Sequence, residues 1–177
     1  MDNRFFPASA IPRLLALHDW TVVSSAFPVP LRPVADTAHR RWAAQHPHRH
    51  PNREILFVLE GGGCQSFGGR VYPARAGTAF VFDSLEPHDL GYPADHPRAL
   101  HLWLAFVQDR CVATAYRFAG GRRRPTEQWR QLFSLQELGL ASGDPLFPQV
   151  SDRGLPPECL RLQVTAALAL LLARLVA

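Results

Sequence analysis

The feature that most constrains the fold is a series of short apolar runs, separated by glycine and proline, through the middle of the chain. Glycines at 61–63 and 68–69 provide the positive φ that tight turns between strands require. Strands are therefore expected at residues 21–27, 37–42 (weaker), 53–59, 64–67, 70–72, 78–82, 88–92, 98–108 and, as the last strand, 112–118. This spacing predicts a mainly β protein whose antiparallel strands close into a jelly-roll barrel.

The final third of the chain changes period and predicts two helices. Pro125-Thr126-Glu127 is a helix-start signal, so a helix is expected over 125–138, ending at Gly139. A second helix is expected from Pro156 to the end, because apolar residues recur there at helical spacing. The expected organisation is an N-terminal arm over residues 1–20, a barrel over 21–124 and a helical segment over 125–177.

The second helix has an apolar stripe formed by Leu160, Val164, Leu168, Leu171 and Leu175. Two interpretations stay open for this stripe. It packs against its own barrel, or it pairs with a partner helix, and we expect a homodimer through the C-terminal helices.

Length and composition place the chain among ordinary globular domains. It has 177 residues, of which 47% are hydrophobic and 19% charged, enough for one domain with a substantial core. The formal charge of +4 is spread along the chain, so nucleic-acid contact by this domain itself is not expected. Three distant cysteines and the absence of a signal-peptide pattern predict a cytoplasmic protein. The most apolar segment, 162–173, is shorter than the roughly 20 residues of a membrane span.

A His-x-His-x-x-x-Glu pattern precedes the strand expected at 53–59. His48 and His50 share one face of an extended chain, and Glu54 keeps the same parity if Pro51 and Asn52 leave the register unchanged. His88 follows the strand at 78–82. Three imidazoles and a carboxylate suit a divalent transition metal such as Zn, Ni, Fe or Mn. The simpler alternative is a polar surface loop.

These motifs resemble the two-motif pattern of the cupin superfamily. His48, His50, Glu54 and His88 fall on that family's four metal-ligand positions. The resemblance implies a cupin-type double-stranded β-helix, that is, a jelly-roll barrel with two C-terminal helices. Within the superfamily, residues 55–107 look most like the sensor domain of AraC-type transcription regulators, which implies binding of a small molecule inside the barrel and dimerisation.

In the arabinose-sensing members of that family, a His-x-Trp on the last barrel strand contacts the sugar. The matching residues are His101 and Trp103, and we assign His46 to the same ligand-binding set. A tryptophan face suits the apolar face of a sugar. The alternative is that Trp103 fills the core and His101 bonds a neighbour.

Two functions follow from the resemblance. The first is a small-molecule-sensing and dimerisation domain of an AraC-type regulator, with an effector such as a sugar and DNA contacted only through a further domain. The family's helix-turn-helix motifs are not among these 177 residues. The second is a stand-alone metal-dependent cupin enzyme of the dioxygenase or sugar isomerase type, in which substrate takes the remaining coordination positions. We expect the sensor.

Overall fold

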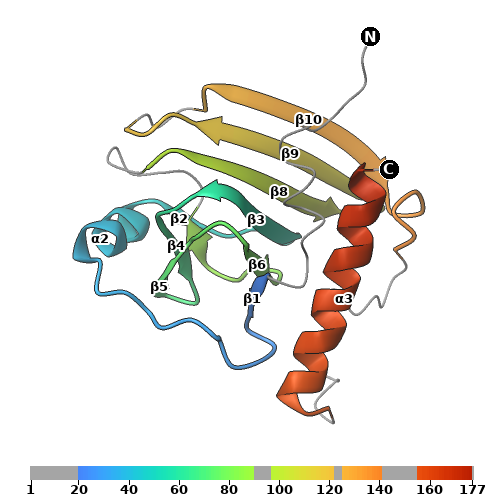
Figure 1. Cartoon of the computed structure of the whole chain (residues 1–177), viewed down its shortest axis with the longest axis horizontal. Coiled ribbons are helices and arrows are strands. Elements are labelled where there is room, and N and C mark those ends of the chain that lie inside the picture. The colour runs from blue at the N-terminus through green and yellow to red at the C-terminus, as the bar shows by residue number, and fades with distance from the viewer. Residues whose placement is uncertain (1–19, 90–96, 122–124, 141–154, 177) are drawn as a thin grey trace.

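The computed structural model describes residues 20–89, 97–121, 125–140 and 155–176. Strands are the commonest regular elements in this part of the chain, which confirms the mainly β class (Figure 1). The elements are β1 (Thr21–Ser24), α2 (Thr37–Gln45), β2 (Pro47–His48), β3 (Arg53–Gly61), β4 (Cys64–Phe67), β5 (Arg70–Pro73), β6 (Thr78–Phe82), β7 (His88–Asp89), β8 (Ala99–Val107), β9 (Arg110–Phe118), β10 (Glu127–Ser134) and α3 (Pro157–Val176).

The strands form two sheets. The larger sheet has the order β1-β6-β3-β8-β9-β10, and its neighbours are antiparallel except for the parallel pair β1 and β6. The smaller sheet has the order β2-β7-β4-β5 and is antiparallel throughout. At the end of β3, Gly61 has φ 86°, and a side chain there would collide with the backbone carbonyl of Arg98. The two sheets are therefore joined by a turn that requires glycine.

Aromatic side chains from both sheets pack against one another. Phe67 of the smaller sheet lies 5.8 Å from Phe82 of the larger one, centroid to centroid, and Phe82 stacks on Trp103 at 5.9 Å. These residues belong to a buried cluster that also contains Leu56 and Phe80. This cluster fills the space between the sheets, because alternate residues of each strand point to it.

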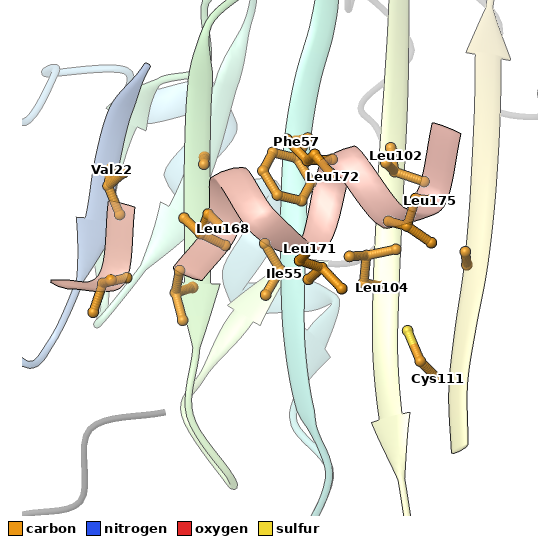
Figure 2. Close-up of a cluster of buried hydrophobic side chains, with 14 of the residues drawn as sticks. Val22, Ile55, Phe57, Leu102, Leu104, Cys111, Leu168, Leu171, Leu172 and Leu175 are labelled. Carbon is orange, nitrogen blue, oxygen red and sulfur yellow. The ribbon is translucent and has the colours of Figure 1, made fainter. Parts of the chain in front are cut away.

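The opposite face of the larger sheet is covered by α3 (Figure 1). Figure 2 shows Leu168, Leu171, Leu172 and Leu175 of the helix directed at strand residues that include Ile55 and Leu104. Leu168 is only 2% exposed. The stripe predicted on this helix therefore packs on its own sheet, and the predicted helix from Pro156 onward is confirmed.

Two predicted elements were wrong. Residues 37–42 form the start of helix α2 instead of a strand, because Asp36 caps the helix by accepting a hydrogen bond from the His39 amide at 2.8 Å. The helix expected over 125–138 is largely strand β10, paired along its length with β9. Strand β9 is therefore not the last strand, and in the described residues only α3 is a C-terminal helix.

The division into arm, barrel and helical segment stays a prediction, and the expected arm lies almost entirely outside the described residues. Within the part of the chain that is described, no helix has the length and hydropathy needed to cross a membrane.

The cysteines provide a test of the packing between α3 and the sheet. Cys111 is fully buried on β9, and burial raises the pKa of its thiol to about 12. Burial, followed by the nearby Asp36 carboxylate, raises the pKa of Cys64 to about 11, whereas Cys159 is exposed. We expect a maleimide to label Cys159 rapidly in the native protein and all three thiols after denaturation. Rapid native labelling of Cys111, detected by peptide mass spectrometry, would contradict the position of α3.

Candidate metal centre

The structure brings His48, His50, Glu54 and His88 together. One nitrogen or oxygen of each side chain lies within 4.8 Å of those of the other three. His48 of β2 pairs directly with His88 of β7, and Glu54 lies near the start of β3. His88 is 4% exposed and Glu54 is 9% exposed, so half of the cluster is buried.

The four side chains do not come from one continuous strand and its neighbour, as the parity argument assumed. β2 ends at His48 and β3 begins at Arg53, so His50 lies in the connection between two different sheets. The shared parity of His48, His50 and Glu54 is therefore not the reason that they meet. The cluster lies where the two sheets face each other, with His48 and His88 from the smaller sheet and Glu54 from the larger one.

The connection that contains His50 is fixed to the loop before β7. The Leu85 amide donates to the backbone carbonyl of His50 at 2.9 Å, and the Ser84 hydroxyl donates to that of Pro51 at 2.7 Å. Leu85 has φ 64°, a left-handed conformation that a leucine rarely adopts. Such strain is typical of functional sites, and here it accompanies the contact that orients His50.

Backbone carbonyls determine which nitrogen of two imidazoles faces the cluster. Nδ1–H of His50 donates to the carbonyl of Asn52 at 2.9 Å, and Nδ1–H of His88 donates to the carbonyl of Glu86 at 2.9 Å. In a neutral ring the other nitrogen, Nε2, then carries a lone pair. This is the arrangement by which proteins orient histidine as a metal ligand.

Both Nε2 atoms face the Glu54 carboxylate. His50 Nε2 lies 3.1 Å from Oε1, and His88 Nε2 lies 3.4 Å from Oε2. These are ion-pair distances, yet His50 Nε2, His88 Nε2 and Glu54 Oε2 are buried without a hydrogen-bond partner. A nitrogen lone pair directed at a carboxylate oxygen is repelled by it unless a proton or a cation lies between the two atoms. The donor set therefore fits a divalent cation.

His48 completes the set with an imidazole that favours its neutral form. Burial lowers the pKa of His48 below its ordinary value, and the neighbouring His88 and His50 lower it further. A metal ligand must be deprotonated at the coordinating nitrogen, so this shift favours coordination near neutral pH.

Aromatic rings form the inner wall of the cluster. The Phe82 ring stacks on His88 at 4.3 Å between centroids, and Trp103 lies 6.2 Å from the same imidazole. Trp103 is 5% exposed and belongs to the core between the sheets. Any small molecule that reached the cluster would meet an apolar wall on this side.

The residues predicted to bind a ligand are not gathered at one point. His101 is buried and lies edge-on to Phe118 at 6.3 Å. His46 is exposed at the end of α2, where it stacks on Trp42 at 4.7 Å and its Nδ1–H donates to the Trp42 carbonyl. Trp103 lies beside the cluster through its contact with His88. The ligand-binding roles of His46, His101 and Trp103 stay predictions.

Buried polar residues beside the cluster were not recognised in the sequence. Asp89 binds His39 of α2 and Gln65 of β4 through its side chain. A signal for Asp89 was its position directly after His88, on the opposite face of the same strand. The sequence contained no comparable signal for His39, because its segment was expected to be a strand.

The fold and the site together define a two-sheet β domain with a candidate metal centre of three histidines and one glutamate between the sheets. Residues 41–104, about a third of the chain, match the family model of the cupin domain, and this segment contains all four residues of the cluster. The match supports membership of the cupin superfamily. No curated protein and no solved structure shows a significant match to the chain.

Proposed function

We propose that this domain holds one divalent transition metal between its sheets and binds a small molecule there. His48, His50 and His88 would provide imidazole nitrogens and Glu54 a carboxylate oxygen. The observation that carries the proposal is the set of three buried atoms without hydrogen-bond partners that meet at one point. When bound, the metal supplies a Lewis acid with coordination positions that a small molecule can occupy. We further propose that the two sheets correspond to the jelly-roll barrel of the superfamily.

We infer that the domain acts as a sensor of the AraC type and dimerises through α3. While one face of the helix packs on the sheet, Leu162 and Leu170 on the other face are 72% and 61% exposed. Together with the exposed Ala166 and Ala173 they form an apolar stripe, at the three- and four-residue spacing of a coiled-coil seam. An isolated stripe of this kind on a monomer is a candidate interface.

A second copy of the chain is the occupant that suits this stripe. If two α3 helices pair antiparallel about a two-fold axis at Ala166, Leu162 of each lies opposite Leu170 of the other, because the two leucines are equally far from Ala166. The small side chain at the crossing point lets the helices approach closely.

Leu170→Arg is expected to convert the dimer into a monomer. It places a charge in the middle of the stripe without touching the face that packs on the sheet. Sedimentation velocity at several protein concentrations measures the change. Arg161→Glu, a change of charge at an exposed position of the same helix outside this stripe, is the control. A wild-type protein that sediments as a monomer at high concentration would contradict the dimer.

The effector is proposed to lie between the metal and the aromatic wall. Trp103 contributes to that wall through its contact with His88, while contacts from His101 and His46 require a ligand that extends along β8 or towards α2. A sugar, with hydroxyl groups for the metal and an apolar face for the rings, has suitable chemistry. Mass spectrometry of small molecules released from the purified protein tests this assignment. A protein that releases no small molecule and binds no added sugar would contradict it.

For a sensor of the AraC type, we propose that DNA is contacted only through a further domain and that the protein is cytoplasmic. A small molecule can shift a regulator only by the difference in its affinity for two states. The measurement is therefore the dimerisation constant with and without metal and effector. Equal constants in all conditions would contradict a sensor that signals through α3.

A metal-dependent enzyme of the dioxygenase or sugar isomerase type is the second candidate. It is favoured by the donor set itself, because three imidazoles and one carboxylate leave positions for a substrate on most first-row metals. Turnover of a candidate substrate by the metal-loaded protein, lost in His50→Ala, would favour the enzyme. Metal binding without turnover would favour the sensor.

A further inference from the structure

Asp89 is a buried carboxylate with three partners, although it contributes nothing to the metal cluster. The residue is 2% exposed. Oδ2 accepts a hydrogen bond from Nε2–H of His39 at 2.5 Å. Oδ1 accepts from the Ser66 amide at 2.8 Å and from the Gln65 side chain, which also donates to the Asp89 carbonyl at 3.0 Å. A buried charge is tolerated only when it is satisfied in this way.

These bonds hold together the elements that carry two of the four cluster residues. Asp89 directly follows His88 in β7, a strand of only two residues whose pairing with β4 is limited to Phe67 and His88. The bonds to Ser66 and Gln65 supplement that short pairing. On the other side, His39 belongs to α2, which runs through His46 into β2 and His48.

The hydrogen bond between His39 and Asp89 therefore joins α2, which leads into the strand of His48, to β7, which carries His88. α2 is also attached to β4 through Asp36, whose Oδ2 accepts a hydrogen bond from the Cys64 thiol at 3.7 Å. Successive side chains of a strand point to opposite faces, so Asp89 lies on the face of β7 away from His88. It can affect the cluster only through the backbone.

We propose that His39 and Asp89 are positioning residues that hold β2 and β7 in register and thereby set the distance between His48 and His88. The proposal rests on the metal-binding function proposed above. It assigns a role to α2, which contributes no ligand. Loss of residues that orient metal ligands typically weakens metal binding by about ten- to a hundred-fold, and we expect the lower end because the effect is transmitted through two short strands.

The test uses His39→Ala, Asp89→Asn and the double variant, with Asp109→Asn as the control for removing an exposed carboxylate. Titration with Co²⁺ measures affinity, and the visible absorption of the saturated protein reports the coordination geometry. Each single variant is expected to bind Co²⁺ about ten-fold more weakly with an altered spectrum. The double variant should bind Co²⁺ no more weakly than either single variant, because both changes remove the hydrogen bond between His39 and Asp89.

Amide hydrogen exchange of the metal-free proteins separates this inference from the metal-binding proposal. Faster exchange in α2, β2 and β4 of the variants, with β8 and β9 unchanged, would support the positioning role even if the wild-type protein bound no Co²⁺. Failure of the wild-type protein to bind Co²⁺ would contradict only the proposed metal centre. Unchanged exchange with unchanged affinity would overturn the positioning role. Loss of the whole fold in both single variants would overturn it as well, because the pair would then be a general folding element.

Discussion

Leu168→Arg is expected to unfold the protein or release α3 from the sheet, whereas Leu170→Arg leaves the fold intact. Leu168 is 2% exposed within the core on the larger sheet, and Leu170 is 61% exposed two residues later. Arginine at position 168 removes a buried leucine and brings a charge into an apolar site without a partner. The expected cost is more than about 4 kcal/mol of unfolding free energy, a large part of the total for a domain of this size.

Urea denaturation of the two variants and the wild type, at one protein concentration, measures this difference. A fixed concentration is needed because dimerisation contributes to apparent stability. Apart from any contribution of dimerisation, Leu170→Arg is expected to change the free energy of unfolding by less than about 1 kcal/mol. A Leu168→Arg protein that is folded and merely monomeric would show that the helix face containing Leu168 contacts a partner instead of the sheet.

Glu54→Gln is expected to have opposite effects on the metal-free and the metal-bound protein. Without metal, the side-chain amide introduced at position 54 can donate to a histidine Nε2 that in the wild type faces a carboxylate without a hydrogen bond. At about pH 8, where free imidazoles are neutral, this should raise the free energy of unfolding by about 1 kcal/mol. With metal, the loss of the anionic ligand should weaken binding by about a hundred-fold or more.

Glu60→Gln is the matched control on the same strand. Its carboxylate accepts a hydrogen bond from Arg117 at 3.1 Å, so its removal should slightly destabilise the protein with or without metal. Thermal unfolding with and without Zn²⁺ measures both variants. Equal destabilisation of the metal-free protein by the two changes would indicate that Glu54 is an ordinary ion-pairing residue.

Much of the β framework could be predicted because its strands alternate or are continuously apolar between glycine turns. Strands β4 and β6 lie where the apolar runs predicted them, and β3, β8 and β9 differ by one or two residues at their ends. In these segments the hydrophobic period and the turn chemistry agree.

Strand β10 was mistaken for a helix because its pattern satisfies both periods. Trp129 and Phe133, which pack towards α3, are four residues apart, a spacing that places them on one side of a helix and also on one face of a strand. Pairing with the whole of β9 decided between the two. No property of the segment alone contains that information.

The cluster residues were found by their types and not by the geometry assumed for them. His48, His50 and Glu54 meet because the chain crosses from one sheet to the other between β2 and β3. Likewise, the partnership of His39 with Asp89 depends on α2 packing near β7, which joins residues fifty positions apart. Such contacts are set by tertiary packing and have no local sequence pattern.

The metal centre is tested most directly by titrating chelator-treated protein with Zn²⁺ or Co²⁺ in a calorimeter. We expect one ion per chain for the wild type and for Glu60→Gln, with binding greatly weakened in His50→Ala and Glu54→Gln. Absence of binding by the wild type, or binding that all four proteins share equally, would contradict it.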